Sequence, residues 1–149
     1  MDRPDVLVVY GTLRSGTGWR EKLDVAHRVE SLGPCTLTGT LHDLGWYPGF
    51  VPDGDDRVQA EALRLLDAEA LAAFDRFEGV DPDRPDAGEY RRVTVAVALS
   101  GTDQPRPAWL YVLNRPAPAD SRVAGGDWLA HLADRDDGGS VAADRAPRS

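Results

Sequence analysis

The sequence predicts a single α+β domain whose β-sheet curls on itself, and three observations support this fold class. Several short runs of β-branched and aromatic residues are separated by turn residues. One segment, residues 68–78, has strong helical character. Strands and helices do not alternate regularly, as they would in a doubly wound parallel sheet. A chain of 149 residues is long enough for one domain with a sizeable core.

The first element is the run VLVVY at Val6–Tyr10, which predicts an interior strand because it is short, continuous and followed by a glycine. The backbone N–H groups of Gly11, Thr12 and Leu13 then lie exposed at the end of this strand. A ligand can approach the main chain closely at Gly11, and successive N–H groups can hold a carboxylate. The same pattern is also typical of an ordinary tight turn leaving a core strand. The residue spacing of phosphate-binding loops does not occur here.

The next segments predict a helical turn or irregular crossing and then two strands. Residues 19–27 are short and mixed. Leu32–Leu44 predicts a strand with a bend or bulge at a glycine. Residues 45–56 are dense in turn residues, and Asp53-Gly54 predicts a hairpin turn. Val58–Leu65 is then the returning strand.

The strongest helix signal follows at Ala68–Glu78. Asp67 is placed as its N-cap, and Gly79 stands where a C′ glycine belongs. Val80–Glu89 is expected to be a polar loop. The remaining elements, in order, are a half-buried strand at Arg91–Leu99, a strand at Ala108–Leu113, a loop at Asn114–Gly126 and a short helix at Trp128–Ala133 capped by Asp127. The domain is expected to span 1–135, with 136–149 as a disordered acidic tail.

Glu78, the last residue of the predicted helix, lies on the apolar side of that helix. With Leu71 set at zero and about 100° per residue, Phe74 falls near roughly 300° and Glu78 near roughly 340°. Burial and the negative end of the helix dipole both disfavour the ionised form, so the pKa is expected to be raised, as suits a general base. The alternative is that the helix frays at Gly79 and Glu78 reaches water. Asp75, at the edge of the apolar arc, is the substitute candidate.

Composition narrows the possible functions. A net charge of −8 and a pI of about 4.8 argue against nucleic acid or an anionic membrane as the main partner. Apolar runs are far shorter than the roughly 20 residues of a membrane helix, the N-terminus does not resemble a signal peptide, and Cys35 is alone, so a cytoplasmic location is expected. The three histidines lack metal-ligand spacing, so a bound metal is not expected.

Four segments resemble the γ-glutamylcyclotransferase-like, or AIG2-like, family: YGTLR at 10–14, LHDLGWYPGFVP at 41–52, DAEALAAFDRFEG at 67–79 and YRRVTVAV at 90–97. The matches occur in the family's order and extend over residues 6 to about 113. The resemblance implies a small curled or closed β-barrel of about six or seven mixed strands with two flanking helices.

The resemblance also implies an activity: release of a γ-glutamyl group as 5-oxoproline from a small γ-glutamyl amine, amide or peptide, without a cofactor. It assigns the general acid/base role to Glu78. It assigns the substrate-binding role to Tyr10, Gly11, Thr12, Leu13 and Tyr90. The loop amides can hold either the α-carboxylate of the substrate or a developing oxyanion.

The chemistry agrees with this assignment, because the substrate's α-amine attacks its own side-chain carbonyl. Such intramolecular attack reaches effective molarities of about 10⁵–10⁸ M, so the enzyme mainly holds a conformation and moves protons. Arg14 and Arg92 are candidates for steering an anionic substrate, although surface placement is the commoner role of an arginine. The second class of function is a non-catalytic small-molecule binding or interaction protein that retains the barrel and its pocket.

Overall fold

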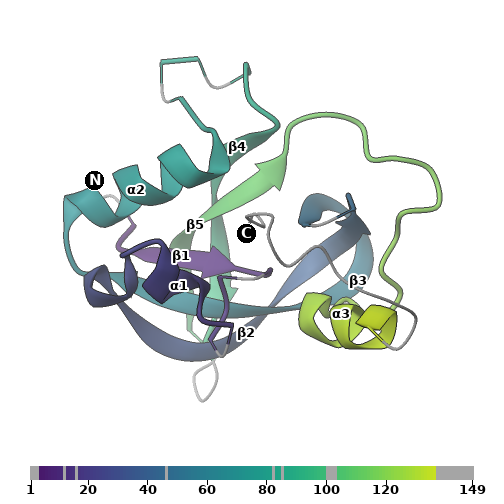
Figure 1. Ribbon diagram of the computed structural model, residues 1–149, viewed down its shortest axis with the longest axis horizontal. Helices are drawn as coiled ribbons and strands as arrows, with labels where there is room; N and C mark the ends of the chain where they lie inside the picture. The colour runs from purple at the N-terminus through teal and green to yellow at the C-terminus, as the bar shows by residue number, and fades with distance from the viewer. Residues whose placement is uncertain are drawn as a thin grey trace.

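The computed structural model describes residues 4–11, 13–15, 17–45, 47–81, 83–84, 86–99 and 104–136 (Figure 1). Its strands are β1 (Val6–Val9), β2 (Val29–Asp43), β3 (Pro48–Leu65), β4 (Tyr90–Ala98) and β5 (Pro105–Leu113). Its helices are α1 (Trp19–Lys22), α2 (Ala68–Glu78) and α3 (Trp128–Asp136), with a 3₁₀ turn at Ala26–Arg28. The α+β class is therefore confirmed. Among the described helices none has the length and apolarity to cross a bilayer.

The five strands form one mixed sheet in the order β2-β3-β1-β5-β4. The central strand β1 is antiparallel to β3 and parallel to β5. The sheet curls until its two edge strands approach each other, and an isolated antiparallel bridge joins Cys35 to Leu99. No continuous ladder closes the barrel within the described ranges. The described residues contain five strands, so the number of six or seven that the resemblance implied was wrong, whereas the five strand segments predicted from the residue pattern correspond to β1–β5.

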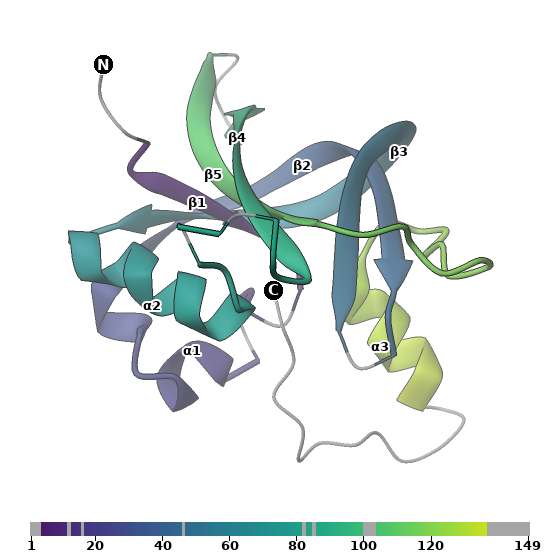
Figure 2. The same cartoon turned by 90° about the horizontal axis from the view of Figure 1, so that it is seen from above.

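β1 is buried on both faces, as its sequence predicts. Val6 and Val8 face the interior of the curled sheet, whereas Leu7 and Val9 face a second core that includes Phe74 of α2. The helices α1 and α2 lie side by side at one end of the molecule, and α3 lies at the other (Figures 1 and 2). The described part of the chain therefore contains three α-helices, where the resemblance implied two. The predicted last helix is longer than expected and ends at Asp136; the expected tail beyond it lies outside the described residues.

The predicted hairpin at Asp53-Gly54 was wrong. The turn between β2 and β3 lies earlier in the chain, where the Leu44 N–H donates to the Tyr47 carbonyl at 3.0 Å. Asp53 and Gly54 instead belong to a bulged part of β3, whose register with β2 shifts between Gly39 and Thr40. The Thr40 hydroxyl donates to the Asp53 carbonyl at 2.7 Å and stabilises this bulge. A turn-forming dipeptide thus bends a strand here because long-range pairing continues on both sides of it.

The bend or bulge predicted at a glycine of β2 is confirmed. The register shifts between Ser31 and Gly33 and again between Gly39 and Thr40. A Cβ at Gly39 would lie 2.5 Å from the Phe50 ring and 2.5 Å from the carbonyl oxygen of Val51. Glycine at this position therefore allows β3 to cross closely over β2.

The helix α2 begins and ends where the sequence predicts. The Asp67 carboxylate accepts from the Ala70 N–H at 2.9 Å, as an N-cap does. Gly79 ends the helix with φ at 74°, the left-handed conformation typical of a C′ glycine. The two caps set the first and last residues of the helix, and so place Glu78 in its last turn.

Candidate functional site

Glu78 is fully buried at the C-terminal end of α2, with 0% of its surface exposed. The expectation that it faces the core is confirmed, and the alternative of a frayed, solvated glutamate was wrong. Two tyrosine hydroxyls, those of Tyr90 and Tyr111, lie within its electrostatic range. The pKa of each tyrosine is raised chiefly by burial and further by nearby charges that include Glu78. Burial likewise disfavours the charged form of a carboxyl group.

Tyr90 opens β4 and is also completely buried. Its hydroxyl donates to the backbone carbonyl of Pro48, at the start of β3. Its ring lies in the same apolar cluster as Leu13 of the strand-exit loop and Phe74 of α2. The end of α2, the start of β4 and the loop after β1 therefore meet in one cluster. Three of the segments singled out in the sequence contribute to it.

The loop after β1 forms a tight turn. The Arg14 N–H donates to the Gly11 carbonyl at 3.2 Å, and Leu13 is buried beneath the turn. The Tyr10 hydroxyl donates to the Tyr111 carbonyl at 2.7 Å and accepts from the Phe50 N–H at 3.3 Å. Its side chain therefore packs in the interior of the curled sheet. Thr12 lies outside the described residues. Its role, and the choice between an ordinary turn and a binding loop, remain predictions.

A second buried carboxylate, Glu61 of β3, lies under the end of this loop. It accepts hydrogen bonds from the Ser15 N–H and the Ser15 hydroxyl, both at 2.6 Å, and from the Ser31 hydroxyl at 2.7 Å. Arg20 completes the group with a contact at 3.2 Å. No role was predicted for Glu61 from the sequence. The available signal was its alternation with the apolar residues of β3, which puts it in phase with buried Leu63.

Asp75, the alternative candidate for the general base, already has two side-chain partners. Its carboxylate forms an ion pair with Arg92 and accepts from the Tyr111 hydroxyl at 2.6 Å. The Arg92 guanidinium also lies 4.5 Å from the centre of the Trp109 ring. Arg92 is therefore a partner of the helix rather than a steering charge on the surface. Arg14, the other steering candidate, pairs with Asp127 at 2.9 Å.

The alternation predicted for β4 holds only over part of the strand. Val93, Val95 and Val97 face the interior of the sheet, but Arg91 is exposed and Arg92 is half-buried. The reason is that α2 covers the other face of β4 near its start, where Tyr90 and Arg92 lie. Each face of this strand is thus buried along a different half of its length.

Tyr47 lies between the buried Tyr90 and the partly exposed Glu89. The Tyr47 ring centre lies 6.3 Å from that of Tyr90, and its hydroxyl donates to the Glu89 carboxylate at 2.6 Å. Arg115 contacts the same carboxylate at 3.3 Å. The loop between α2 and β4 therefore ends beside Tyr47 and Tyr90, close to Glu78.

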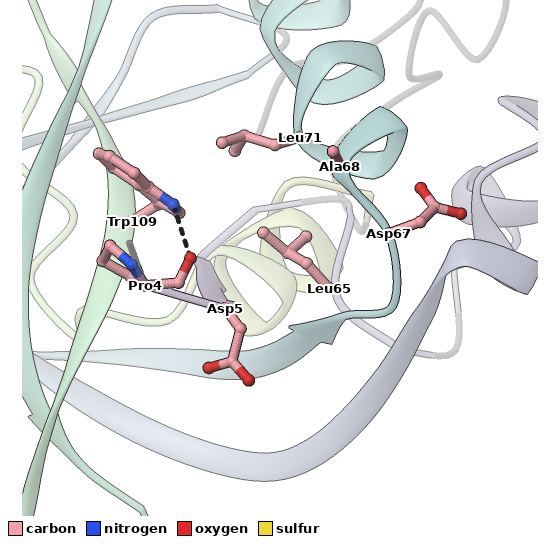
Figure 3. Close-up of a pocket in the computed structure, with 7 residues that line it drawn as sticks. All are labelled: Pro4, Asp5, Leu65, Asp67, Ala68, Leu71 and Trp109. Atoms are coloured by element: carbon pink, nitrogen blue, oxygen red, sulfur yellow. Dashed lines mark hydrogen bonds between the residues drawn. The ribbon is translucent and has the colours of Figure 1, made fainter. Parts of the chain in front are cut away.

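A separate groove lies at the opposite end of α2, lined by Leu65, Ala68, Leu71 and Trp109 among others (Figure 3). Its volume is about 210 Å³, and the Trp109 indole N–H donates across it to the Pro4 carbonyl at 3.0 Å. The groove lies at the N-terminal end of the helix, roughly 15 Å from Glu78 along the helix axis. The groove is therefore separate from Glu78, although Leu65 and Trp109 also pack against the apolar cluster that contains Tyr90.

Solved structures define the class of fold. The structure of PH0828 from Pyrococcus horikoshii matches with a TM-score of 0.60 at 20% identity, over 89% of this chain and 96% of PH0828. An AIG2-like protein from Mus musculus matches with a TM-score of 0.60 at 20% identity, over 78% of this chain and 82% of the mouse protein. At these identities the likeness concerns the fold alone. The molecule has the γ-glutamylcyclotransferase-like fold.

Sequence comparison identifies the family. The chain is 33% identical over 124 residues to the γ-glutamylcyclotransferase family protein YtfP of Escherichia coli K12, covering 83% of this chain and 95% of YtfP. The solution structure of E. coli YtfP matches with a TM-score of 0.56 at 31% identity, over 88% of this chain and 98% of YtfP. The model of the γ-glutamyl cyclotransferase, AIG2-like family matches residues 7–130. The chain belongs to this family, which confirms the resemblance noted in its sequence.

Proposed function

We propose that this protein is a γ-glutamyl cyclotransferase that releases 5-oxoproline and a free amine from a small γ-glutamyl amine, amide or peptide. Family membership supports the substrate class. The single observation that carries the proposal is Glu78, a carboxyl group with 0% exposure that lies close enough to Tyr90 to help raise the pKa of that tyrosine. An acidic side chain is expensive to bury, and a functional role accounts for that cost.

The substrate's α-amine, whose pKa is about 8, reacts in its neutral –NH2 form after its ammonium proton has passed to solvent. The neutral nitrogen attacks the γ-carbonyl carbon, a C–N bond forms, and the five-membered ring closes. Glu78 accepts the proton that this nitrogen loses. It then donates the proton to the departing nitrogen as the original amide bond breaks. The products are 5-oxoproline and the free amine, and Glu78 returns to its ionised form.

The strand-exit loop is the proposed glutamyl-binding element, comprising Tyr10, Gly11, Thr12 and Leu13. We assign its contribution to backbone N–H groups, because the Tyr10 hydroxyl is occupied by backbone partners of β5 and β3. Tyr90 is proposed as a wall of the pocket. These groups hold the folded-back substrate in which amine and carbonyl lie close enough to react.

The experiment that tests this function is a panel of γ-glutamyl amines, amides and dipeptides incubated with the purified protein and assayed for 5-oxoproline. Turnover of at least one member, dependent on protein concentration, is expected. Saturable binding of γ-glutamyl compounds without release of 5-oxoproline would instead favour the non-catalytic binding protein. The absence of both binding and turnover across the panel would contradict the proposed substrate class.

A further inference from the structure

The carboxylate of Glu61 joins three segments that are distant in the sequence. Ser15 contributes its N–H and its hydroxyl from the loop after β1, Arg20 contributes a guanidinium from α1, and Ser31 contributes a hydroxyl from β2. Arg20 also donates to the Ser15 hydroxyl at 2.7 Å, which makes the group a closed network. Glu61 itself is only 8% exposed.

These contacts favour the ionised form of Glu61 and give both of its oxygens hydrogen-bond donors. Burial alone raises its pKa, but the hydrogen bonds from Ser15 and Ser31 and the charge of Arg20 outweigh burial, and the net shift is downward. One oxygen accepts from the Ser15 N–H, and the other accepts from Ser15, Ser31 and Arg20. A carboxylate bound in this way is poorly suited to take a proton from a substrate. Its role is to hold the groups that surround it.

What Glu61 holds is the far end of the strand-exit loop. In the sheet, Val9 pairs directly with Glu61, so the loop leaves β1 opposite this residue. Ser15, six positions further along, then returns to the Glu61 carboxylate. The loop is therefore tied at both ends to the same point of β3. The turn between these ends, closed by the Arg14 N–H and the Gly11 carbonyl, contains the proposed substrate-binding amides.

We propose that Glu61 is a positioning residue that fixes the strand-exit loop in the conformation that binds the glutamyl group. The inference rests on the proposed function for its effect on catalysis. Its effect on the loop itself is independent of any reaction. Glu61 contacts no substrate and acts through Ser15. Its loss is therefore expected to weaken substrate binding before it alters proton transfer at Glu78.

The test is Glu61→Gln, which preserves the side chain's size but replaces the anion by an amide. Amide hydrogen exchange of residues 13–15, followed by NMR, should accelerate by about tenfold or more, because the charge-assisted bond to the Ser15 N–H is lost. On a substrate found in the γ-glutamyl panel, KM should rise by about tenfold while kcat stays within about threefold of wild type. Asp56→Asn is the matched control, since it removes another carboxylate of β3 whose partner is Arg122.

The outcomes separate this inference from the proposed function. Unchanged exchange at 13–15 in Glu61→Gln, or an equal change in Asp56→Asn, would overturn the positioning role. A selective fall in kcat at constant KM would also overturn it, since Glu61 would then act on the chemical step. If Glu61→Gln does not fold, Ser31→Ala is the second test, because it removes one hydrogen-bond donor to Glu61. The proposal then requires that amide exchange accelerate selectively at residues 13–15 in this variant. If the wild type turns over no substrate, the exchange comparison still tests the loop.

Discussion

Two buried carboxylates, Glu61 of β3 and Glu78 of α2, have different surroundings. Glu61 is surrounded by donors from Ser15, Ser31 and Arg20, and its pKa is lowered. Glu78 is more deeply buried, within electrostatic range of the Tyr90 and Tyr111 hydroxyls. Burial by itself does not distinguish a catalytic acid from a structural one. The number and charge of the surrounding donors determine whether a buried carboxylate holds the structure or is suited to move a proton.

Asp75 extends this comparison within a single helix. It lies one turn before Glu78 in α2 and is 6% exposed, yet it is held by Arg92 and by the Tyr111 hydroxyl. The pair fixes the rotation of α2 against β4 and β5. A helix held in this way at one turn presents the side chain of the next turn in a defined direction, so Asp75 supports the placement of Glu78.

The largest expected effect is that of Glu78→Gln. This nearly isosteric change removes the proton acceptor, and 5-oxoproline release should fall by about 10²–10⁴-fold. The thermal midpoint should not fall, because a neutral amide is easier to bury than a carboxylate. Activity assays and a thermal melt on the same preparation measure both. Full activity in the variant would show that another residue is the general base. Glu78 would then not differ from Glu61 in having a catalytic role.

Arg92→Met should have the largest effect on stability. It leaves the Asp75 carboxylate without its guanidinium, and the cost is expected at about 2–4 kcal/mol because the two side chains are 15% and 8% exposed. Urea unfolding measures this change. Arg91→Met, at the exposed neighbouring position of β4, is the control and should stay within about 0.5 kcal/mol of wild type. Equal costs in the two variants would show that the ion pair does not hold α2.

A smaller effect is expected from acid. The folded-state pKa of Glu61 lies below the ordinary value of 4.5, so its ionised form stabilises the fold above that pH. This contribution is lost as the pH falls below the unfolded value and through the folded one. The difference in stability between wild type and Glu61→Gln should therefore shrink from pH 6 toward pH 3. Melts recorded across this range measure it, and a difference that grows on acidification would contradict the assigned charge state.

The smallest effect is expected from substituting Arg14. In addition to the bonds between Ser15 and Glu61, its ion pair with Asp127 links the strand-exit loop to the start of α3. Its partner Asp127 also caps α3 by accepting from the Ala130 N–H at 3.2 Å, and that cap survives in Arg14→Met. The side chains are 17% and 32% exposed, so the loss should be no more than about 1 kcal/mol. The KM for substrate should change by less than about threefold. A larger rise in KM than that of Glu61→Gln would make Arg14, not Glu61, the principal anchor of the loop.

The sequence by itself determined the elements that depend on neighbouring residues. The caps at Asp67 and Gly79 define α2, and its helical period turns Glu78 toward the core. The apolar run of β1 and the glycine after it predict a central strand that ends in a tight turn. Each of these features is set by interactions within a few positions along the chain, so a local pattern is sufficient to predict them.

Only the tertiary structure decided which distant groups meet. Asp53-Gly54 became a bulge because β2 and β3 continue to pair beyond it. Asp75 met Arg92 because α2 covers one half of β4. Glu61 gained its partners because β1, β2 and β3 are neighbours in the sheet and α1 folds beside them. These contacts depend on strand order and register, which arise from the packing of the whole chain and leave little trace in any local stretch of sequence.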